Sequence, residues 1–302
     1  MVSPATVRYR YGRHETFAVR YGWLTKAAYQ VEEQGGLNAS LETADELGLG
    51  SKMIQSLQFW VEAMGLVQTQ ERAAVATERQ RLTALGALVW RHDRYLEYPA
   101  TWWFLHMELC SVPGTIWSWF FNEFEERHFD RNACVDAFLR HTREKAQNPA
   151  TPAVAQKDVA CLLAAYAAPM AAETADPEDG VASPLRELGL ILRHDQVHRF
   201  ERVRAPFRLP PEAFLAAASK LASVLGKGSL SLEELARRPN GPGRLLCLGF
   251  ESLDAAVEAA CDTYWKQGVR TELLGAERHL LLPAKAPVHW LKDHYRRLGL
   301  VK

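Results

Sequence analysis

The chain has 302 residues, 48 % of them hydrophobic, which is enough for two or three domains with a substantial buried core. Lys and Arg total 36, as do Asp and Glu, so the net charge gives no sign of binding to a polyanion. The sequence shows no signal peptide and no apolar run of about 18 residues, and it therefore predicts a cytoplasmic protein that does not span a membrane.

The cysteines are widely spaced and form no C-x-x-C pair. This spacing favours buried thiols over a disulfide framework or a zinc site. The five are Cys110, Cys134, Cys161, Cys247 and Cys261.

Residues 41–67 have the pattern of a helix-turn-helix. Apolar residues at helical spacing predict a short helix, Gly48 and Gly50 interrupt it, and Ser51 is expected to cap a longer helix. One face of the longer helix is expected to be buried, with Met53, Leu57, Trp60, Val61 and Met64. The opposite face carries Ser51, Lys52, Gln55, Gln58, Phe59 and Glu62. Two amphipathic helices joined by a turn are also a generic packing unit, so the spacing admits other helical hairpins.

The flanking segments complete a winged-helix pattern. Residues 8–34 begin with several arginines and continue as a helix, whose buried stripe is predicted to be Tyr21, Leu24, Ala28 and Val31. Residues 69–85 are expected to form the wing and its return strand.

The middle of the chain is predicted to be helical and rich in tryptophan. Helices are expected at 130–143 and 156–167, a short helix after Ser183 and Pro184, and two strands within 191–204. Large aromatic side chains at helical spacing are typical of a core rather than of a ligand site. The cluster consists of Trp90, Trp102, Trp103, Trp117 and Trp119.

The last third repeats the opening pattern. Helices are expected at 210–224, 231–238, 252–265 and 288–298, a strand at 244–248, and a hairpin at 269–282. Ser231 and Glu234 have the spacing of a capping box. The predicted fold class is therefore mainly α with small β-hairpins, with two winged helix-turn-helix modules (1–90 and 206–302) flanking a helical middle (91–205).

No catalytic motif supports an enzymatic activity, and no cofactor or metal is expected. P-loop, dinucleotide-binding, zinc-protease and serine-hydrolase motifs are absent from the sequence. His194, Asp195 and His198 lie close together but supply no evident third metal ligand, and the pairing of His14 with Glu15 is interpreted as a local cap. A hydrolase or transferase with an unrecognised site remains an alternative.

Several segments, in order and spacing, resemble the bacterial domain-of-unknown-function family 4007. They are GRHETFAVRYGWLTKAAY, ELGLGSKMIQSLQFWVEAMGLV, DRYLEYPATWWFLHMEL, FFNEF, KDVACLLAAY, SPLRELGLI and PGRLLCL. The chain departs from the family at Asp93-Arg94, where Asp-Pro is usual, and at Tyr98, where an acid is usual. Members tend to be encoded beside phosphoadenosine-phosphosulfate-reductase-like proteins in DNA phosphorothioation or phage-defence islands. The resemblance thus implies an accessory defence protein without an established activity.

Two functions follow as hypotheses. The first is a non-enzymatic protein that binds double-stranded DNA in a sulfur-modification or anti-phage system, or that regulates transcription of its own operon. The residues expected to contact DNA are Arg13, Arg20, Ser51, Lys52, Gln55, Gln58, Arg72, Arg79 and Arg81.

The second hypothesis is a scaffold that docks a sulfur-transfer or reductase-like partner or a second copy of the chain. It rests on an acidic ridge formed by Asp254, Glu258 and Asp262, which DNA phosphates would repel.

Overall fold

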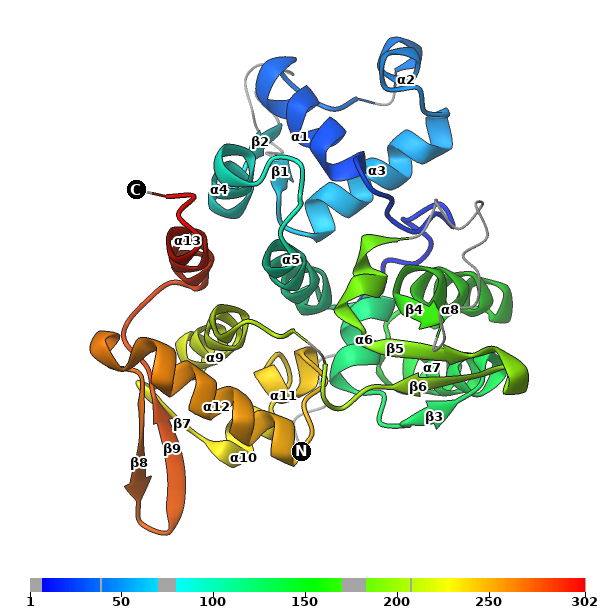
Figure 1. The fold of residues 1–302 in the computed structure, drawn as a ribbon. Coiled ribbons are helices and arrows are strands. Elements are labelled where there is room, and N and C mark those ends of the chain that lie inside the picture. Colours follow the sequence, from blue (N-terminus) through cyan, green and yellow to red (C-terminus); the bar gives the residue numbers. More distant parts are fainter. Residues whose placement is uncertain (1–6, 39, 70–79, 170–182, 207, 302) are drawn as a thin grey trace.

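The computed structural model describes residues 7–38, 40–69, 80–169, 183–206 and 208–301. The fold is mixed α/β with small sheets, and 56 % of the described residues are helical (Figure 1). Among the described residues no helix is long and apolar enough to cross a membrane.

The N-terminal part is a group of three helices followed by a hairpin. Its elements are α1 (Trp23–Glu33), α2 (Leu41–Leu47), α3 (Ser51–Ala63), β1 (Val67–Thr69) and β2 (Gln80–Leu82). The two strands are antiparallel, with Val67 opposite Leu82. The tip of the predicted wing, residues 70–79, lies outside the described residues.

The turn between α2 and α3 depends on glycine, but the predicted cap was wrong. Gly48 ends α2 with φ 63°, a conformation that costs other residues energy. Gly50, not Ser51, is the N-cap of α3, and no side chain caps this helix. Ser51 is instead its first residue, and its side chain is exposed.

The buried face of α3 matches the prediction in part. Trp60 and Leu57 have no exposed surface, whereas Met53 is only half-buried. Phe59, expected to face outward, packs against the core. In α1, Tyr21 was wrongly placed in the buried stripe, because it precedes the helix and is half exposed, while Trp23 is buried.

The middle combines helices with a four-stranded sheet, in which the two strands expected within 191–204 are present and two further short strands were not predicted. The helices are α4 (Ala84–His92), α5 (Pro99–Ser111), α6 (Ile116–Asn122), α7 (Arg131–Lys145), α8 (Pro152–Tyr166) and the 3₁₀ helices η3 (Pro184–Leu188) and η4 (Asp195–Val197). The strands are β3 (His128–Phe129), β4 (Ala167–Pro169), β5 (Ile191–His194) and β6 (Arg199–Arg202), in the order β3-β6-β5-β4. β4 and β5 are parallel and the other pairs antiparallel.

Helix α5 is buried on almost every side and lies at the centre of the molecule (Figure 1). The tryptophan cluster was correctly predicted to be core for four of its members, Trp102, Trp103, Trp117 and Trp119. Trp90 is half-buried, and the guanidinium of Arg94 lies 4.4 Å from its ring centroid.

His106 of α5 links three segments from the centre of the core. Its Nε2–H donates to the carbonyl oxygen of Leu245 (2.7 Å), so Nδ1 accepts from the hydroxyl of Tyr166 (2.7 Å). Burial lowers the pKa of His106 to about 4, and the ring is therefore neutral near pH 7.

The C-terminal part contains five α-helices and a three-stranded sheet. Its elements are α9 (Pro211–Leu225), β7 (Ser229–Ser231), α10 (Leu232–Arg237), α11 (Pro242–Leu245), α12 (Phe250–Tyr264), η5 (Trp265–Gln267), β8 (Arg270–Leu274), β9 (Glu277–Leu281) and α13 (Pro287–Arg297). The antiparallel strand order is β7-β9-β8. The predicted capping box of Ser231 and Glu234 is present. The strand expected at 244–248 is wrong, since α11 covers its beginning.

Helix α13 joins the C-terminal part to the rest of the chain by packing against α9, α4 and α5. The Tyr295 hydroxyl donates to Thr101 (2.6 Å), whose hydroxyl donates to the buried carboxylate of Asp93 (2.5 Å). Buried apolar residues from all three parts form one continuous core.

Candidate nucleic-acid interface

The outward face of α3 presents three of the four polar side chains predicted for DNA contact. Ser51, Lys52 and Gln55 are exposed. Gln58 is half-buried, and its Nε2 donates to the carbonyl oxygen of Leu37 (2.8 Å). Gln58 therefore holds the loop before α2 in place, so the side chains of Ser51, Lys52 and Gln55 in the first turns of α3 remain as the predicted DNA contacts that are exposed on this helix.

The predicted arginines differ in their surroundings. Arg13 and Arg81 are exposed. Arg20 is half-buried, with its guanidinium 5.5 Å from the ring centroid of Trp23. Arg72 and Arg79 lie outside the described residues.

A loop before α1 holds α3 at a fixed position. The hydroxyl of Ser56 donates to the carbonyl oxygen of His14 (2.8 Å), and the indole N–H of Trp60 donates to that of Phe17 (2.9 Å). Both donors are fully buried. Since an unsatisfied buried donor costs about 1–3 kcal/mol, these two hydrogen bonds fix the position of α3 against the loop.

The same loop is tied to α8 by a buried pair that the sequence did not reveal. The backbone N–H of Thr16 donates to Nδ1 of His14 (3.0 Å), so Nε2 carries the proton and donates to Asp158 (3.1 Å). Asp158 also accepts from the backbone N–H of Gly12 (3.0 Å). His14 thus caps its own loop, as predicted, and is in addition a buried anchor to α8. Its partner lies 144 residues away, which no local pattern indicates.

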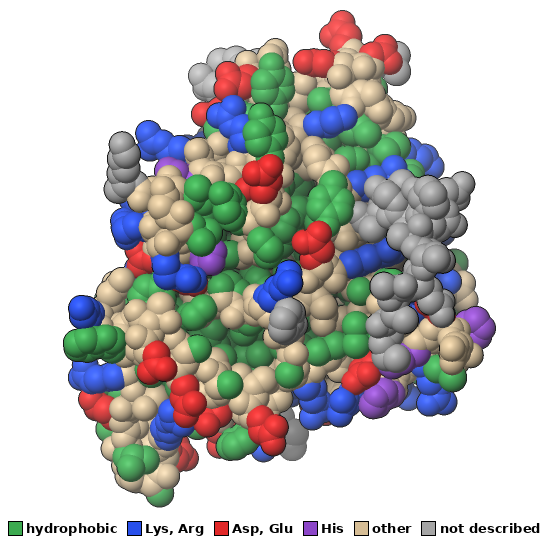
Figure 2. All heavy atoms as spheres, viewed as in Figure 1, with side chains coloured by type: hydrophobic (Ala, Val, Ile, Leu, Met, Phe, Trp, Pro, Cys, Tyr) green, Lys and Arg blue, Asp and Glu red, His purple; other side chains and the backbone are tan. Residues whose placement is uncertain are grey.

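Acidic residues lie near this surface as well. Glu42, Asp45 and Glu46 of α2 and Glu62 of α3 are exposed. On the face drawn in Figure 2, basic side chains form several separate groups with acidic ones between them. A DNA contact on α3 is therefore expected to be local rather than part of a broad basic band.

The acidic ridge predicted on α12 is only partly free. Asp254 accepts from the guanidinium of Arg278 (2.5 Å), which offsets its charge. Glu258 and Asp262 are exposed. The predicted docking surface consequently depends on these two carboxylates.

The described residues contain no group of three or more His, Cys, Asp or Glu side chains suited to a metal ion. His194 lies 3.3 Å from Glu201, with which it forms a hydrogen bond.

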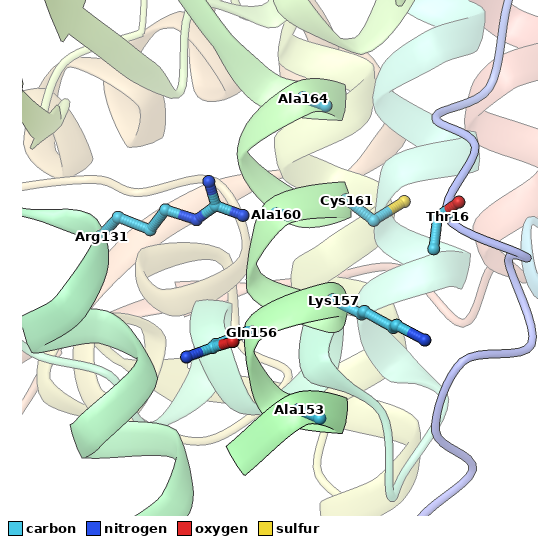
Figure 3. A pocket seen from close by; sticks show the side chains of 8 residues that line it. All are labelled: Thr16, Arg131, Ala153, Gln156, Lys157, Ala160, Cys161 and Ala164. Atoms are coloured by element: carbon cyan, nitrogen blue, oxygen red, sulfur yellow. The ribbon is translucent and has the colours of Figure 1, made fainter.

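A cavity of about 430 Å³ lies along α8 and is lined mainly by small side chains. Figure 3 shows Arg131 and Lys157 on opposite sides of the helix, with Cys161 directed toward Thr16. The two basic groups do not converge on one point, and burial raises the pKa of the Cys161 thiol well above its ordinary value. This cavity gives no indication of a reactive centre.

The model of the family described as "Protein of unknown function (DUF4007)" matches residues 11–295. The chain belongs to the DUF4007 family. The match spans the α3 surface, the central helices and most of α13.

Two crystal structures of SspB share the fold. A magnesium-ion-bound SspB structure is 25 % identical with a TM-score of 0.83, and the alignment covers 97 % of this chain and 90 % of that one. A second SspB structure is 26 % identical with a TM-score of 0.82 and the same coverage of both chains. No curated protein matches the chain.

Proposed function

We propose that this DUF4007 protein binds double-stranded DNA through α3, as an accessory protein of a DNA sulfur-modification or anti-phage system. The observation that carries the proposal is the exposed group of Ser51, Lys52 and Gln55 at the start of a helix that follows a glycine turn. Lysine suits phosphate or guanine contact, and glutamine can pair with adenine in the major groove.

The order of elements supports the same proposal. Three helices followed by an antiparallel hairpin, α1 to β2, have the order of a winged helix-turn-helix, in which the second helix of the pair enters the major groove. The C-terminal part, with sheet order β7-β9-β8 around α9, α10 and α12, has a similar order. We therefore propose two winged-helix modules, of which the first contacts DNA.

The setting in sulfur modification or phage defence rests on the family resemblance. Reductase-like proteins encoded beside family members are the proposed partners. Exposed Glu258 and Asp262 on α12 favour a second role, the docking of a basic surface on such a partner or on a second copy of the chain.

The DNA proposal predicts the behaviour of the double variant Lys52→Glu, Gln55→Ala. Both side chains are exposed, so the fold is expected to persist. A lost base contact costs about 1–3 kcal/mol, which lowers affinity about 5- to 150-fold. Fluorescence anisotropy with a labelled duplex measures this change.

The matched control is Lys292→Glu, which reverses a charge on an exposed position of α13. It is expected to retain the affinity of the unmodified chain. Equal affinities of the double variant and the control would exclude α3 as the DNA-contacting helix.

A further inference from the structure

A second surface, remote from α3, gathers arginines from four separate segments. A cavity of about 390 Å³ lies between β6 and the helices α10 and α11, in the lower half of Figure 1, whereas α3 lies in the upper half. Its charged lining, which we term the arginine pocket, consists of Arg127, Arg202, Arg204, Arg237, Arg244 and Glu125.

Arg202 forms the buried part of the arginine pocket. It is 9 % exposed, and its guanidinium donates to the carbonyl oxygens of Phe121 (2.9 Å), Arg244 (3.2 Å) and Phe124 and to the sulfur of Cys247 (3.3 Å). None of these acceptors is charged, and no carboxylate among the described residues forms an ion pair with Arg202. A buried charge without a counter-ion is costly, so an anion that enters the cavity gains a favourable partner.

The rim arginines form ion pairs that differ in exposure, and Arg244 also donates to the carbonyl oxygen of Arg237 (3.4 Å). Arg127 pairs with Glu201 (2.8 Å) and Arg244 with Glu125 (3.1 Å). Arg237 pairs with Glu233 at 3.4 Å, with both side chains largely exposed. Because an exposed pair contributes about 0–1 kcal/mol, Arg237 can exchange Glu233 for a stronger anion at little cost. The pairs of Arg127 and Arg244 each have one less exposed member, and they hold these two guanidinium groups at the rim.

Arg204 adds the second charge without a partner. It is exposed, and no ion pair or side-chain hydrogen bond involves its guanidinium within the part of the chain that the structure describes. Its backbone is fixed, because its carbonyl oxygen accepts from the N–H of Gly249 (2.7 Å) and the hydroxyl of Ser252 (2.6 Å). Arg202 and Arg204 therefore leave the arginine pocket with an excess of positive charge at a defined place.

We propose that the arginine pocket binds a phosphate group. Guanidinium groups bind phosphate oxygens through paired, charge-assisted hydrogen bonds, and several guanidinium groups around one cavity suit a doubly charged anion. The cavity volume falls in the range of small-molecule sites, about 300–1,000 Å³. The phosphate belongs either to a small molecule such as a nucleotide or to the end of a nucleic-acid strand. The site is independent of the DNA contact proposed for α3.

Isothermal titration calorimetry of the full chain with sodium pyrophosphate tests the proposal. Saturable binding is expected, and Arg204→Glu is expected to weaken it at least about tenfold, since charge-assisted bonds are lost and a repulsive charge is added. Arg237→Glu, on a different segment, is expected to weaken binding in the same direction. Both side chains are exposed, so neither change is expected to unfold the chain.

The matched control is Arg199→Glu, the same charge reversal at an exposed position of β6 that does not line the cavity. Its pyrophosphate affinity is expected to stay within about twofold at physiological ionic strength, because its exposed side chain does not line the cavity and salt screens its charge. Absence of saturable binding, or equal loss in Arg204→Glu and Arg199→Glu, would overturn the proposal.

A second titration identifies the source of the phosphate. Two single-stranded oligonucleotides of one sequence, with and without a 5′-phosphate, are compared in the unmodified chain and in Arg204→Glu. A preference for the phosphorylated strand that disappears in Arg204→Glu supports a nucleic-acid end. Equal binding of both strands, together with Arg204-dependent pyrophosphate binding, supports a small-molecule ligand.

Discussion

Trp60 connects the proposed DNA-contacting helix to the central core. Its side chain has no exposed surface, its N–H donates to the carbonyl oxygen of Phe17, and its ring centroid lies 5.0 Å from that of Trp117. The buried position of the Trp60 indole therefore fixes the rotation of α3, and with it the outward direction of Lys52 and Gln55.

Trp60→Ala is expected to destabilise the fold by roughly 3–5 kcal/mol, because it removes a large buried ring and the shorter of two hydrogen bonds to the Phe17 carbonyl oxygen. Urea unfolding monitored by circular dichroism measures the loss. Trp265→Ala is the control, since Trp265 is 64 % exposed. A loss no greater than that of the control would contradict the role given to Trp60.

Sequence periodicity was sufficient to predict the burial of Trp60, because helical spacing places it with Leu57 and Val61. It was insufficient for Gln58, which has the spacing of an outward residue. The partner of Gln58 is a backbone carbonyl in a loop, and its position depends on tertiary structure.

At the scale of elements, α9, α12 and α13 are joined by the carboxylate of Glu212. This side chain has no exposed surface and accepts hydrogen bonds from Tyr264 (2.5 Å), His294 (3.0 Å) and Arg297 (2.8 Å). Burial alone raises the pKa of Glu212, but the bonds from His294, Arg297 and Tyr264 outweigh it and lower the pKa to about 2.

This lowered pKa predicts an acid-sensitive C-terminal part. The unfolded chain takes up a proton at Glu212 near pH 4.5 and the folded chain only near pH 2. The ionised carboxylate therefore stabilises the folded chain fully above about pH 4.5, and this stabilisation is lost as the pH falls to about 2. This stabilisation is on the order of 3 kcal/mol in the free energy of unfolding. Urea unfolding at several pH values is expected to show a shallower decline for Glu212→Gln than for the unmodified chain. Parallel curves would contradict the assignment.

Capping residues were a mixed guide to helix starts: the capping box predicted at Ser231 is present, whereas Gly50 and not the predicted Ser51 is the N-cap of α3. The strand predicted at 244–248 failed because a short buried apolar run does not distinguish strand from helix. Tertiary contact decides here: a side chain at Gly243 would place its Cβ 2.4 Å from the carbonyl oxygen of Ala236, so α11 packs directly on α10. Strands β3 and β4 were missed because they are short and pair only with distant segments.

At the scale of the whole molecule, one core holds two surfaces of different chemistry in opposite halves (Figure 1). The α3 surface could be predicted, since its residues are consecutive on one helix. The arginine pocket could not, because Arg127, Arg202 and Arg244 are far apart in sequence and meet only where β6 lies beside α11.

The most direct test of the central claim is an equilibrium titration of the full chain with duplex DNA over a series of salt concentrations. Binding is expected to be saturable and to weaken linearly in a plot of log affinity against log salt, with a slope of about 0.9 per phosphate contact. The slope is expected to be smaller for the Lys52→Glu, Gln55→Ala variant than for the unmodified chain. Absence of saturable binding at the lowest salt concentration would contradict a DNA-binding function for this protein.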